Sequence, residues 1–276
     1  MKLYDFDGMF DEKLSEYMNK NPEKYTESEW ESVIPAMYKK FGDTFIKSVG
    51  DTPNGFYAKM SAEELVCALR THLKKDAPVP GYLCDAIEKR NSAELLLPLL
   101  DGSQSEKEYA VNLLGADEAA LKKYMELLVS PATDADLKEN LLDKIKEKAD
   151  LVKDKAIENY NKGTDKVCML EILSRTVVPD DRVFDILLKA FRTDPDNIPV
   201  NAGYLAAYGD ERALEYLLDK IDEEGITYIE YKELLIAIET LGGSYKKERD
   251  FSSDPSYGII KSASVPVFDF PDDKKD

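Results

Sequence analysis

The motif Asp5-Phe6-Asp7-Gly8 is the first place in the chain where residue types and spacing could perform chemistry. An aspartate in a D-x-D-G motif can attack a phosphate group, and the same pattern forms half of a calcium loop. Phosphate transfer needs a buried strand before the motif and a hydroxyl residue after its glycine, whereas a lysine precedes the motif and Met9 follows it. We therefore expect a turn in which Asp5 or Asp7 caps a helix over residues 9–19, with Phe6 and Phe10 packed on the N-terminal region.

A second calcium-loop candidate lies around Gly225, where acidic residues surround the glycine. With Gly225 at the sixth position of such a loop, Lys220 is first and Tyr231 is last, so both end ligands are missing. At the first motif, Asp11 and Glu12 come too early to supply the last ligand. We expect neither a metal nor a cofactor, and we interpret the stretch around Gly225 as a helix–helix turn with its acids in solvent.

His72 is the only histidine, so any catalytic relay or zinc site that needs an imidazole must use it. It lies near the end of a capped helix, where histidine commonly shields the last carbonyl groups. Cys67, Cys84 and Cys168 stand among apolar neighbours without a C-x-x-C pair, which indicates buried thiols in a reducing cytoplasm. Because the glycine-rich phosphate loop and the H-E-x-x-H motif are also missing, we expect that the chain is not an enzyme.

The net charge of −18 arises from 55 acidic against 37 basic residues. Such a surface repels phosphate backbones and anionic lipids, and the basic runs are short, such as Lys74-Lys75 and Lys246-Lys247. This argues against nucleic acid as a partner. The first 30 residues show no signal peptide, and no window reaches the roughly 18 apolar residues of a membrane span. We expect a cytoplasmic protein without a membrane segment.

Residues 1–90 are expected to form an irregular region of four to six helices. Thr26-Glu27-Ser28-Glu29 and Ser61-Ala62-Glu63-Glu64 have the capping-box pattern, in which the hydroxyl accepts from the third amide and the glutamate reaches back. Pro35 lies within the helix that Thr26 would begin, so this helix is expected to kink or restart there.

From about residue 91 the chain becomes periodic. Pro179–Phe191 and Gly209–Ile221, which lie 30 residues apart, share an aspartate, an arginine and a Leu-Leu pair at equivalent positions. In both, an aspartate stands at the N-cap position before an apolar stripe with helical spacing. Four such stripes begin 32, 31 and 30 residues apart. The stripes are Leu121, Tyr124, Met125 and Leu128; Lys153, Ala156, Ile157 and Tyr160; Phe184, Leu187, Leu188 and Phe191; and Leu214, Leu217, Leu218 and Ile221.

A second set of helices is expected between these stripes. Two helices with one apolar stripe each cannot bury both stripes alone, whereas stacked pairs form a continuous core. The sequence therefore predicts an all-α fold with repeated helix pairs over residues 91–243. The second helices are expected near residues 104–115, 134–147, 165–177, 195–208 and 227–242.

This region resembles the HEAT/armadillo-like superfamily of α-helical repeats. The resemblance is carried by Asn112–Leu121, Tyr204–Leu214 and Ala237–Gly243, in which a helix ends in small and apolar residues before a turn that contains glycine. It implies a right-handed helical-repeat solenoid, an α-α superhelix with an extended surface. The repeat unit here is shorter than is usual in that superfamily.

After Gly242-Gly243 the periodicity stops, and residues 244–276 form a tail rich in Ser, Pro, Asp and Lys. The tail contains apolar clusters at Ile259-Ile260 and Val265–Phe270. This apolar content favours docking over mobility, so we expect the tail to pack on the chain's own surface as a terminal cap.

Candidate interaction residues come from aromatic and acidic patterns. Tyr204 and Tyr208 lie four apart on one predicted inner helix with Asn201 just before them, where they would line a ligand groove or, alternatively, fill a wide repeat core. The acidic turns would form a rim along one edge that suits a basic peptide, or would only keep the protein soluble. The candidate residues are Trp30, Asn201, Tyr204, Tyr208, Asp194, Asp196, Asp222, Glu223 and Glu224.

These expectations favour a non-catalytic protein-interaction scaffold or adaptor that uses the surface of a helical-repeat array, with a protein or a basic peptide as partner. One alternative is a regulatory module with a small-ligand pocket between the N-terminal helices and the repeats, lined by Trp30 and tyrosines. A helical-repeat enzyme, such as a DNA-base glycosylase or a chromophore lyase, is a third reading. The net charge argues against the first enzyme, and the lack of a cysteine or histidine cluster argues against the second.

Overall fold

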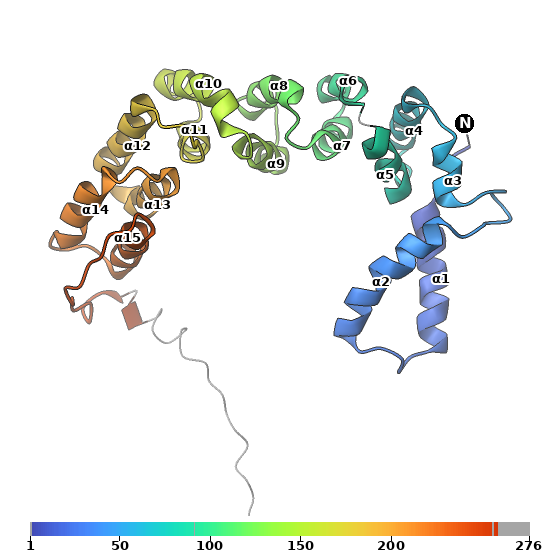
Figure 1. Ribbon diagram of the computed structural model, residues 1–276, viewed down its shortest axis with the longest axis horizontal. Helices are drawn as coiled ribbons and strands as arrows, with labels where there is room; N and C mark the ends of the chain where they lie inside the picture. The colour runs from blue at the N-terminus through green and yellow to red at the C-terminus, as the bar shows by residue number, and fades with distance from the viewer. Residues whose placement is uncertain (1, 91, 256, 259–276) are drawn as a thin grey trace, which may run out of the picture. The chain divides into compact units, whose positions relative to one another are not determined.

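The computed structural model describes residues 2–90, 92–255 and 257–258 (Figure 1). Over these residues the chain forms fifteen α-helices and two short 3-10 helices. The described residues contain no β-strand, and one isolated bridge joins Ile46 and Asp51. The predicted all-α fold is confirmed. Within the same residues no helix is both long enough and apolar enough to span a membrane.

The chain divides into two compact units. Unit 1 comprises the residues up to Tyr124 together with Asp134–Lys144, and unit 2 comprises Met125–Thr133 together with the residues from Ile145 onward. The division passes through two consecutive helices, α8 (Glu118–Leu128) and α9 (Ala135–Lys146). The sequence limits at residues 90 and 243 concern the repeat pattern and stay predictions.

Unit 1 begins with five helices up to Arg90, within the predicted four to six. The first starts three residues earlier than expected, because Asp5 is its N-cap and accepts a hydrogen bond from Gly8 N at 2.8 Å. The helices are α1 (Phe6–Lys20), α2 (Glu27–Gly42), α3 (Pro53–Ala58), α4 (Ala62–Lys74), α5 (Gly81–Arg90), α6 (Ala93–Leu96), the 3-10 helix η1 (Leu97–Asp101) and α7 (Gln104–Leu114).

Both predicted capping boxes of unit 1 are present. Thr26 caps α2 and Ser61 caps α4, and each hydroxyl accepts a hydrogen bond from the amide three residues later. The glutamate at that third position, Glu29 or Glu64, accepts in return from the amide of the cap residue. α2 continues through Pro35 as one helix, so of the two predicted alternatives the restart does not occur, and the kink stays a prediction. A proline inside a helix removes one amide donor and crowds the carbonyl four residues before it, so this helix depends on its other hydrogen bonds and on packing.

Asp7 links three helices of unit 1. Its Oδ1 accepts a hydrogen bond from the Tyr38 hydroxyl at 2.6 Å, and its Oδ2 accepts one from Gly81 N, at the start of α5, at 2.9 Å. The Tyr82 hydroxyl donates to the Tyr38 carbonyl at 2.7 Å, and the two rings stack with centroids 4.4 Å apart. Burial, followed by the bond to Asp7, raises the pKa of Tyr38. The expected capping role thus belongs to Asp5, whereas Asp7 fixes α1 to α2 and α5.

Phe6 and Phe10 are buried, as predicted. The Phe6 ring meets the ring of Tyr57 edge to face with centroids 5.7 Å apart, and Phe10 meets Phe41 at 5.6 Å. Aromatic pairs at these distances add to the free energy of apolar burial. The first turns of α1 are therefore part of the unit 1 core.

The predicted burial of all three thiols is wrong, because Cys67 is exposed. α4 buries Leu65, Ala68 and Leu69, and Cys67 lies on its other face. Cys84 and Cys168 are half-buried.

His72 lies in the last turn of α4, where the sequence placed it, but its side chain is only 2% exposed. Its Nδ1 has no hydrogen-bond partner. Burial lowers the pKa of the imidazole, while the carbonyl of Pro78 and the charge of Asp5 act in the opposite direction. His72 is therefore a core residue of unit 1.

Unit 2 consists mainly of helix pairs. α11, α13 and α15 fall where the second set of helices was predicted, and α13 packs against both α12 and α15 (Figure 1). The handedness of this array stays a prediction. The helices are α10 (Ala149–Lys162), α11 (Lys166–Leu173), α12 (Asp181–Thr193), the 3-10 helix η2 (Pro195–Asn197), α13 (Ile198–Tyr208), α14 (Ala213–Asp222) and α15 (Tyr228–Thr240).

The predicted apolar stripes are mostly buried. All four stripe residues of α8 and all four of α12 lie in the core. In α14 the buried positions are Ala213, Leu217 and Ile221, and the predicted Leu214 and Leu218 are half-buried. The buried stripe of α14 therefore begins one residue earlier than predicted, at Ala213, which a pattern of large apolar residues does not reveal.

The aspartate and arginine that recur 30 residues apart form an arginine ladder at one edge of unit 2. Each arginine binds the aspartate two residues before it and a second aspartate on the preceding helix of the same set. The bond to Arg182 is the main reason that the pKa of Asp180 is lowered. The four ion pairs are Arg182–Asp180 at 2.7 Å, Arg182–Asp154 at 2.8 Å, Arg212–Asp210 at 2.7 Å and Arg212–Asp181 at 2.9 Å.

Candidate functional site

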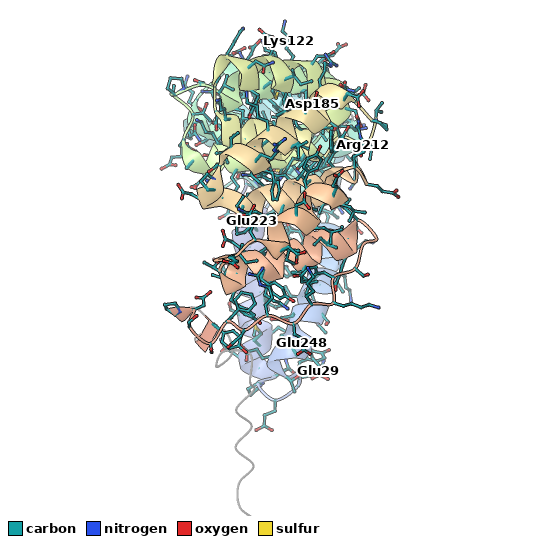
Figure 2. All side chains as sticks on the ribbon, turned by 90° about the vertical axis from the view of Figure 1, so that its left-hand side faces the viewer. Glu29, Lys122, Asp185, Arg212, Glu223 and Glu248 are labelled. Atoms are coloured by element: carbon teal, nitrogen blue, oxygen red, sulfur yellow. The ribbon has the colours of Figure 1, made fainter. Side chains whose placement is uncertain are left out.

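An acidic turn joins α14 to α15. Asp222 ends α14, Gly225 has the left-handed φ of 82° that favours glycine, and Thr227 caps α15 through a capping box with Glu230. Figure 2 shows Arg212 and Glu223 at the two ends of α14, on opposite edges of unit 2. The acidic turn and the arginine ladder therefore lie on different edges.

The segment Tyr245–Phe251, which follows α15, lies along this turn. The Tyr245 hydroxyl donates to Asp222 Oδ1 at 2.6 Å, and Lys247 Nζ donates to Asp222 Oδ2 at 2.5 Å. These two bonds, that of Lys247 first, lower the pKa of the Asp222 carboxyl. One carboxylate thus holds two side chains that are two residues apart in the segment.

Arg249 covers the carboxyl end of α14. Its guanidinium donates to the carbonyl oxygen of Ile221 and, at 2.7 Å, to that of Glu223. These carbonyls lack partners inside the helix and carry the negative end of the helix dipole, which favours a cation there. Arg249 therefore acts as a C-terminal cap that comes from a distant part of the sequence.

Phe251 completes the contact. It is 8% exposed and its ring lies among those of Tyr228, Tyr231 and Tyr257, with the Tyr231 centroid 4.9 Å away. Asp254 Oδ2 accepts a hydrogen bond from Tyr228 N, in the first turn of α15, at 2.6 Å. The segment is therefore fastened to both helices of the last pair.

The contacts of the segment alternate along the chain. Tyr245, Lys247, Arg249 and Phe251 contact the turn or the helices beside it, although the Lys247 side chain remains 69% exposed. The residues between them, Lys246, Glu248 and Asp250, are exposed. A period of two is the geometry of an extended chain, whose successive side chains point to opposite sides. The described part of the tail thus packs on its own chain. The predicted clusters Ile259-Ile260 and Val265–Phe270 lie outside the described residues.

Of the predicted acidic residues, Asp222 and Glu223 belong to this site, and Glu224 is exposed on the same turn. Asp194 and Asp196 lie at the neighbouring turn between α12 and α13, where Asp194 accepts a hydrogen bond from Asn197 Nδ2 at 3.0 Å. A groove of about 300 Å³, lined by residues that include Pro195 and Glu223, lies between the two turns. The structure thus brings the two acidic turns to one edge of unit 2.

The predicted residues of α13 make contacts inside unit 2. Asn201 is 3% exposed and donates to the Ala190 carbonyl at 3.5 Å. The Tyr208 hydroxyl accepts from Asp180 N at 2.8 Å and donates to its carbonyl at 3.1 Å. Tyr204 is half-buried, and burial raises its pKa. These contacts agree with the core alternative for the three residues.

Trp30, the remaining candidate, belongs to α2 in unit 1. Its side chain is 9% exposed and meets the rings of Tyr25 and Tyr17 with centroids 4.9 and 6.3 Å away. The indole is therefore largely covered by the tyrosines around it.

Four residues of this site are absent from the residues predicted from the sequence: Tyr245, Lys247, Arg249 and Phe251. The available signal is their alternate spacing, with aromatic residues at both ends and basic residues between, directly after the last repeat. As a basic run, Lys246-Lys247 is too short to indicate nucleic-acid binding. In the extended segment beside the acidic turn, Lys247 of this pair binds Asp222.

The described residues contain no group of three or more His, Cys, Asp or Glu side chains arranged to hold a metal ion. Comparison with protein-family models, curated proteins and solved structures finds no match for the chain. Any functional proposal therefore rests on the turn between α14 and α15 and on the segment that it holds.

Proposed function

We propose that the chain is a non-catalytic protein-interaction scaffold, built on HEAT-like helix pairs in a right-handed array, whose α14–α15 turn binds an extended protein segment with aromatic and basic residues at alternate positions. One observation supports this proposal above all. The turn already holds a segment of that kind, Tyr245–Phe251 of the same chain.

The turn offers a different contact to each side chain of such a segment. The Asp222 carboxylate accepts from a hydroxyl and an ammonium group, and the free carbonyls at the end of α14 accept from the planar guanidinium of an arginine. The rings of Tyr228 and Tyr231 surround an aromatic side chain. Because these contacts are spaced by two residues, they select a sequence pattern and not only a charge.

The charge of the chain favours a basic partner at this edge. Asp194, Asp196 and Glu224 add to the negative potential near the turn, and the chain as a whole carries a net charge of −18. A negative field steers cationic segments to the site and raises the association rate, with a strong dependence on salt. The expected partner is therefore a protein with a basic and aromatic extended segment.

A peptide-binding measurement on the full chain tests this proposal. The host is the full chain with Lys247→Glu and Arg249→Glu, which weakens its own segment, and the probe is a labelled peptide that comprises residues 244–258. Fluorescence anisotropy is expected to give a Kd of roughly 1–100 μM for this host. The unmodified chain should bind the same peptide at least about tenfold more weakly, because its own segment competes at a high effective concentration.

Two controls decide the outcome. Adding Asp222→Lys to the host should abolish binding, and a peptide with glutamate in place of Lys247 and Arg249 should not bind. Equal binding to all hosts, or no binding of the unmodified peptide to the first host, would contradict the proposal. Circular dichroism of each host is the check that its helices are intact.

A further inference from the structure

A groove of about 410 Å³ lies between α1 and α2 of unit 1. The two helices are antiparallel, because Phe10 meets Phe41 near one end of the pair and Tyr17 meets Trp30 near the other. The α1 wall includes Leu14 and Tyr17, and the α2 wall includes Val33 and Met37. The groove is therefore mainly apolar along its length.

The walls of the groove carry apolar side chains that the packing of α1 on α2 does not fully cover. Leu14, Val33 and Met37 are apolar yet only half-buried, although each lies on the side of its helix that faces the pair. Where only two helices pack together, the apolar residues along one side of their contact line stay uncovered. A third helix with apolar residues at i, i+3, i+4 and i+7 fits along such a line. Methionine at one wall adds a side chain that adapts to different partners.

The charged residues that line the groove are both lysines. Lys13 lies on the α1 wall with Nζ 5.0 Å from the centroid of the Phe41 ring, and Lys40 lies on the α2 wall. Near the far end of the pair, Lys24 donates a hydrogen bond to the Tyr17 hydroxyl. In a chain with a net charge of −18, an apolar groove with cations on both walls is a local exception.

The acidic residues of the two helices do not line the groove. Asp11, Glu12 and Glu16 are exposed and are not among the α1 residues that line the groove, which are those at 10, 13, 14 and 17. Glu29 of α2 is held in the capping box by Thr26. The charged side chains that line the apolar seam itself are therefore all positive.

We propose that the groove between α1 and α2 docks an amphipathic helix of a partner protein whose apolar stripe is flanked by acidic residues. The apolar stripe covers Leu14, Val33 and Met37, and the flanking carboxylates pair with Lys13 and Lys40. Helix-in-groove binding of this kind draws its affinity from buried apolar area and its selectivity from the flanking charges. This surface is independent of the α14–α15 turn and of the extended segment that the turn binds.

Trp30 makes the proposal directly measurable. It is the only tryptophan, and it meets Tyr17 and Tyr25, which both line the groove. A helix docked against these tyrosines changes the surroundings of the indole. A probe without tryptophan therefore reports binding through the emission of Trp30 alone.

The experiment titrates the full chain with two synthetic helical peptides of about 18 residues, long enough to form helix on a surface. Both carry leucines at i, i+3, i+4 and i+7 and lack Trp and Tyr. One has glutamates beside the stripe, and the other has lysines. The glutamate peptide is expected to shift the Trp30 emission with a Kd of roughly 1–100 μM, and the lysine peptide should bind at least about tenfold more weakly.

The matched variant is the full chain with Lys13→Glu and Lys40→Glu, which changes two exposed side chains and leaves the core intact. It should reverse the preference, so that the lysine peptide binds more tightly than the glutamate peptide. A second variant, Met37→Ala, should weaken both peptides about fivefold or more. The proposal is overturned if the glutamate peptide does not bind, or if its affinity is unchanged by the charge reversal.

Discussion

Asp7 in unit 1 and Asp222 in unit 2 use the same chemistry in different settings. Each carboxylate accepts a tyrosine hydroxyl at 2.6 Å on Oδ1, from Tyr38 and Tyr245 respectively. On Oδ2, Asp7 accepts from the amide of Gly81, and Asp222 accepts from an ammonium group.

The difference lies in where the donors come from. The donors to Asp7 belong to helices that already pack together in an aromatic core. The donors to Asp222 belong to an extended segment, and the Asp222 side chain remains 44% exposed. Similar hydrogen bonds therefore stabilise the fold at Asp7 and hold a separable segment at Asp222. Four measurements test the two units for this difference.

Replacing Asp7 with alanine is expected to have the largest effect. It leaves the Tyr38 hydroxyl and the Gly81 amide without their acceptor in a half-buried site, so the free energy of unfolding should fall by about 2–3 kcal/mol. Urea denaturation measures this loss. The matched change Asp5→Ala removes only the helix cap and should cost about 1 kcal/mol. Equal losses for the two variants would mean that Asp7 contributes no more than a cap.

Phe251→Ala should release the extended segment with a smaller effect on the helices. The lost burial among Tyr228 and Tyr231 amounts to about 2 kcal/mol of docking free energy, so the exchange of the Tyr228 amide and tryptic cleavage at Arg249 should both become faster. Hydrogen exchange and limited proteolysis measure these rates. Glu248→Ala, on the exposed side of the segment, should change neither rate, and a similar effect of both variants would remove the contrast.

Lowering the pH should weaken unit 1 through His72. Burial lowers the pKa of this imidazole below the ordinary value of 6.5, so the unfolded chain binds the proton more readily. The stabilising contribution is complete above pH 6.5 and is lost as the pH falls toward the folded pKa. Because His72 is the only histidine, urea denaturation between about pH 5 and 7 should show this slope, and His72→Gln should remove it. A slope that persists in the variant would assign it to other groups.

Asp222→Asn should have the smallest effect on global stability, because its site is largely solvent-exposed. It should still speed tryptic cleavage at Lys247 by roughly threefold at low salt and less at high salt, since added ions screen the same attraction. Glu224→Gln, on the same turn, is the matched control and should leave the cleavage rate unchanged. Equal rates for the two variants would show that the carboxylate does not hold the segment.

The local features of the fold could be predicted from the sequence because neighbouring residues determine them. The capping boxes at Thr26 and Ser61 need only residues three positions apart, and the stripe of α12 needs only helical spacing. The aspartate and arginine of Asp180 and Arg182 recur at Asp210 and Arg212, but the ion pairs that they form were not predicted. Each of these signals lies within about two helical turns.

The features that were missed depend on contacts between distant parts of the chain. The partners of Asp7 lie 31 and 74 residues away in sequence, and nothing near the motif indicates them. Cys67 has apolar neighbours, but the rotation of α4 in the core turns it to solvent. The sequence indicates that the acidic turn between α14 and α15 suits basic side chains. It does not indicate that Tyr245–Phe251 binds there, because that depends on where the end of α15 places Tyr245 relative to Asp222.

The arginine ladder has a consequence for how a chain of this kind can change in length. Arg212 binds Asp210 within its own block and Asp181 in the block before, and Arg182 does the same with Asp180 and Asp154. A duplicated block of about 30 residues would therefore bring a complete joint with it, and a deleted block would take one away without leaving an unmatched charge. The chain can therefore gain or lose whole blocks of about 30 residues with the arginine ladder kept complete. The pair α14–α15, which binds the extended segment, has to remain the last.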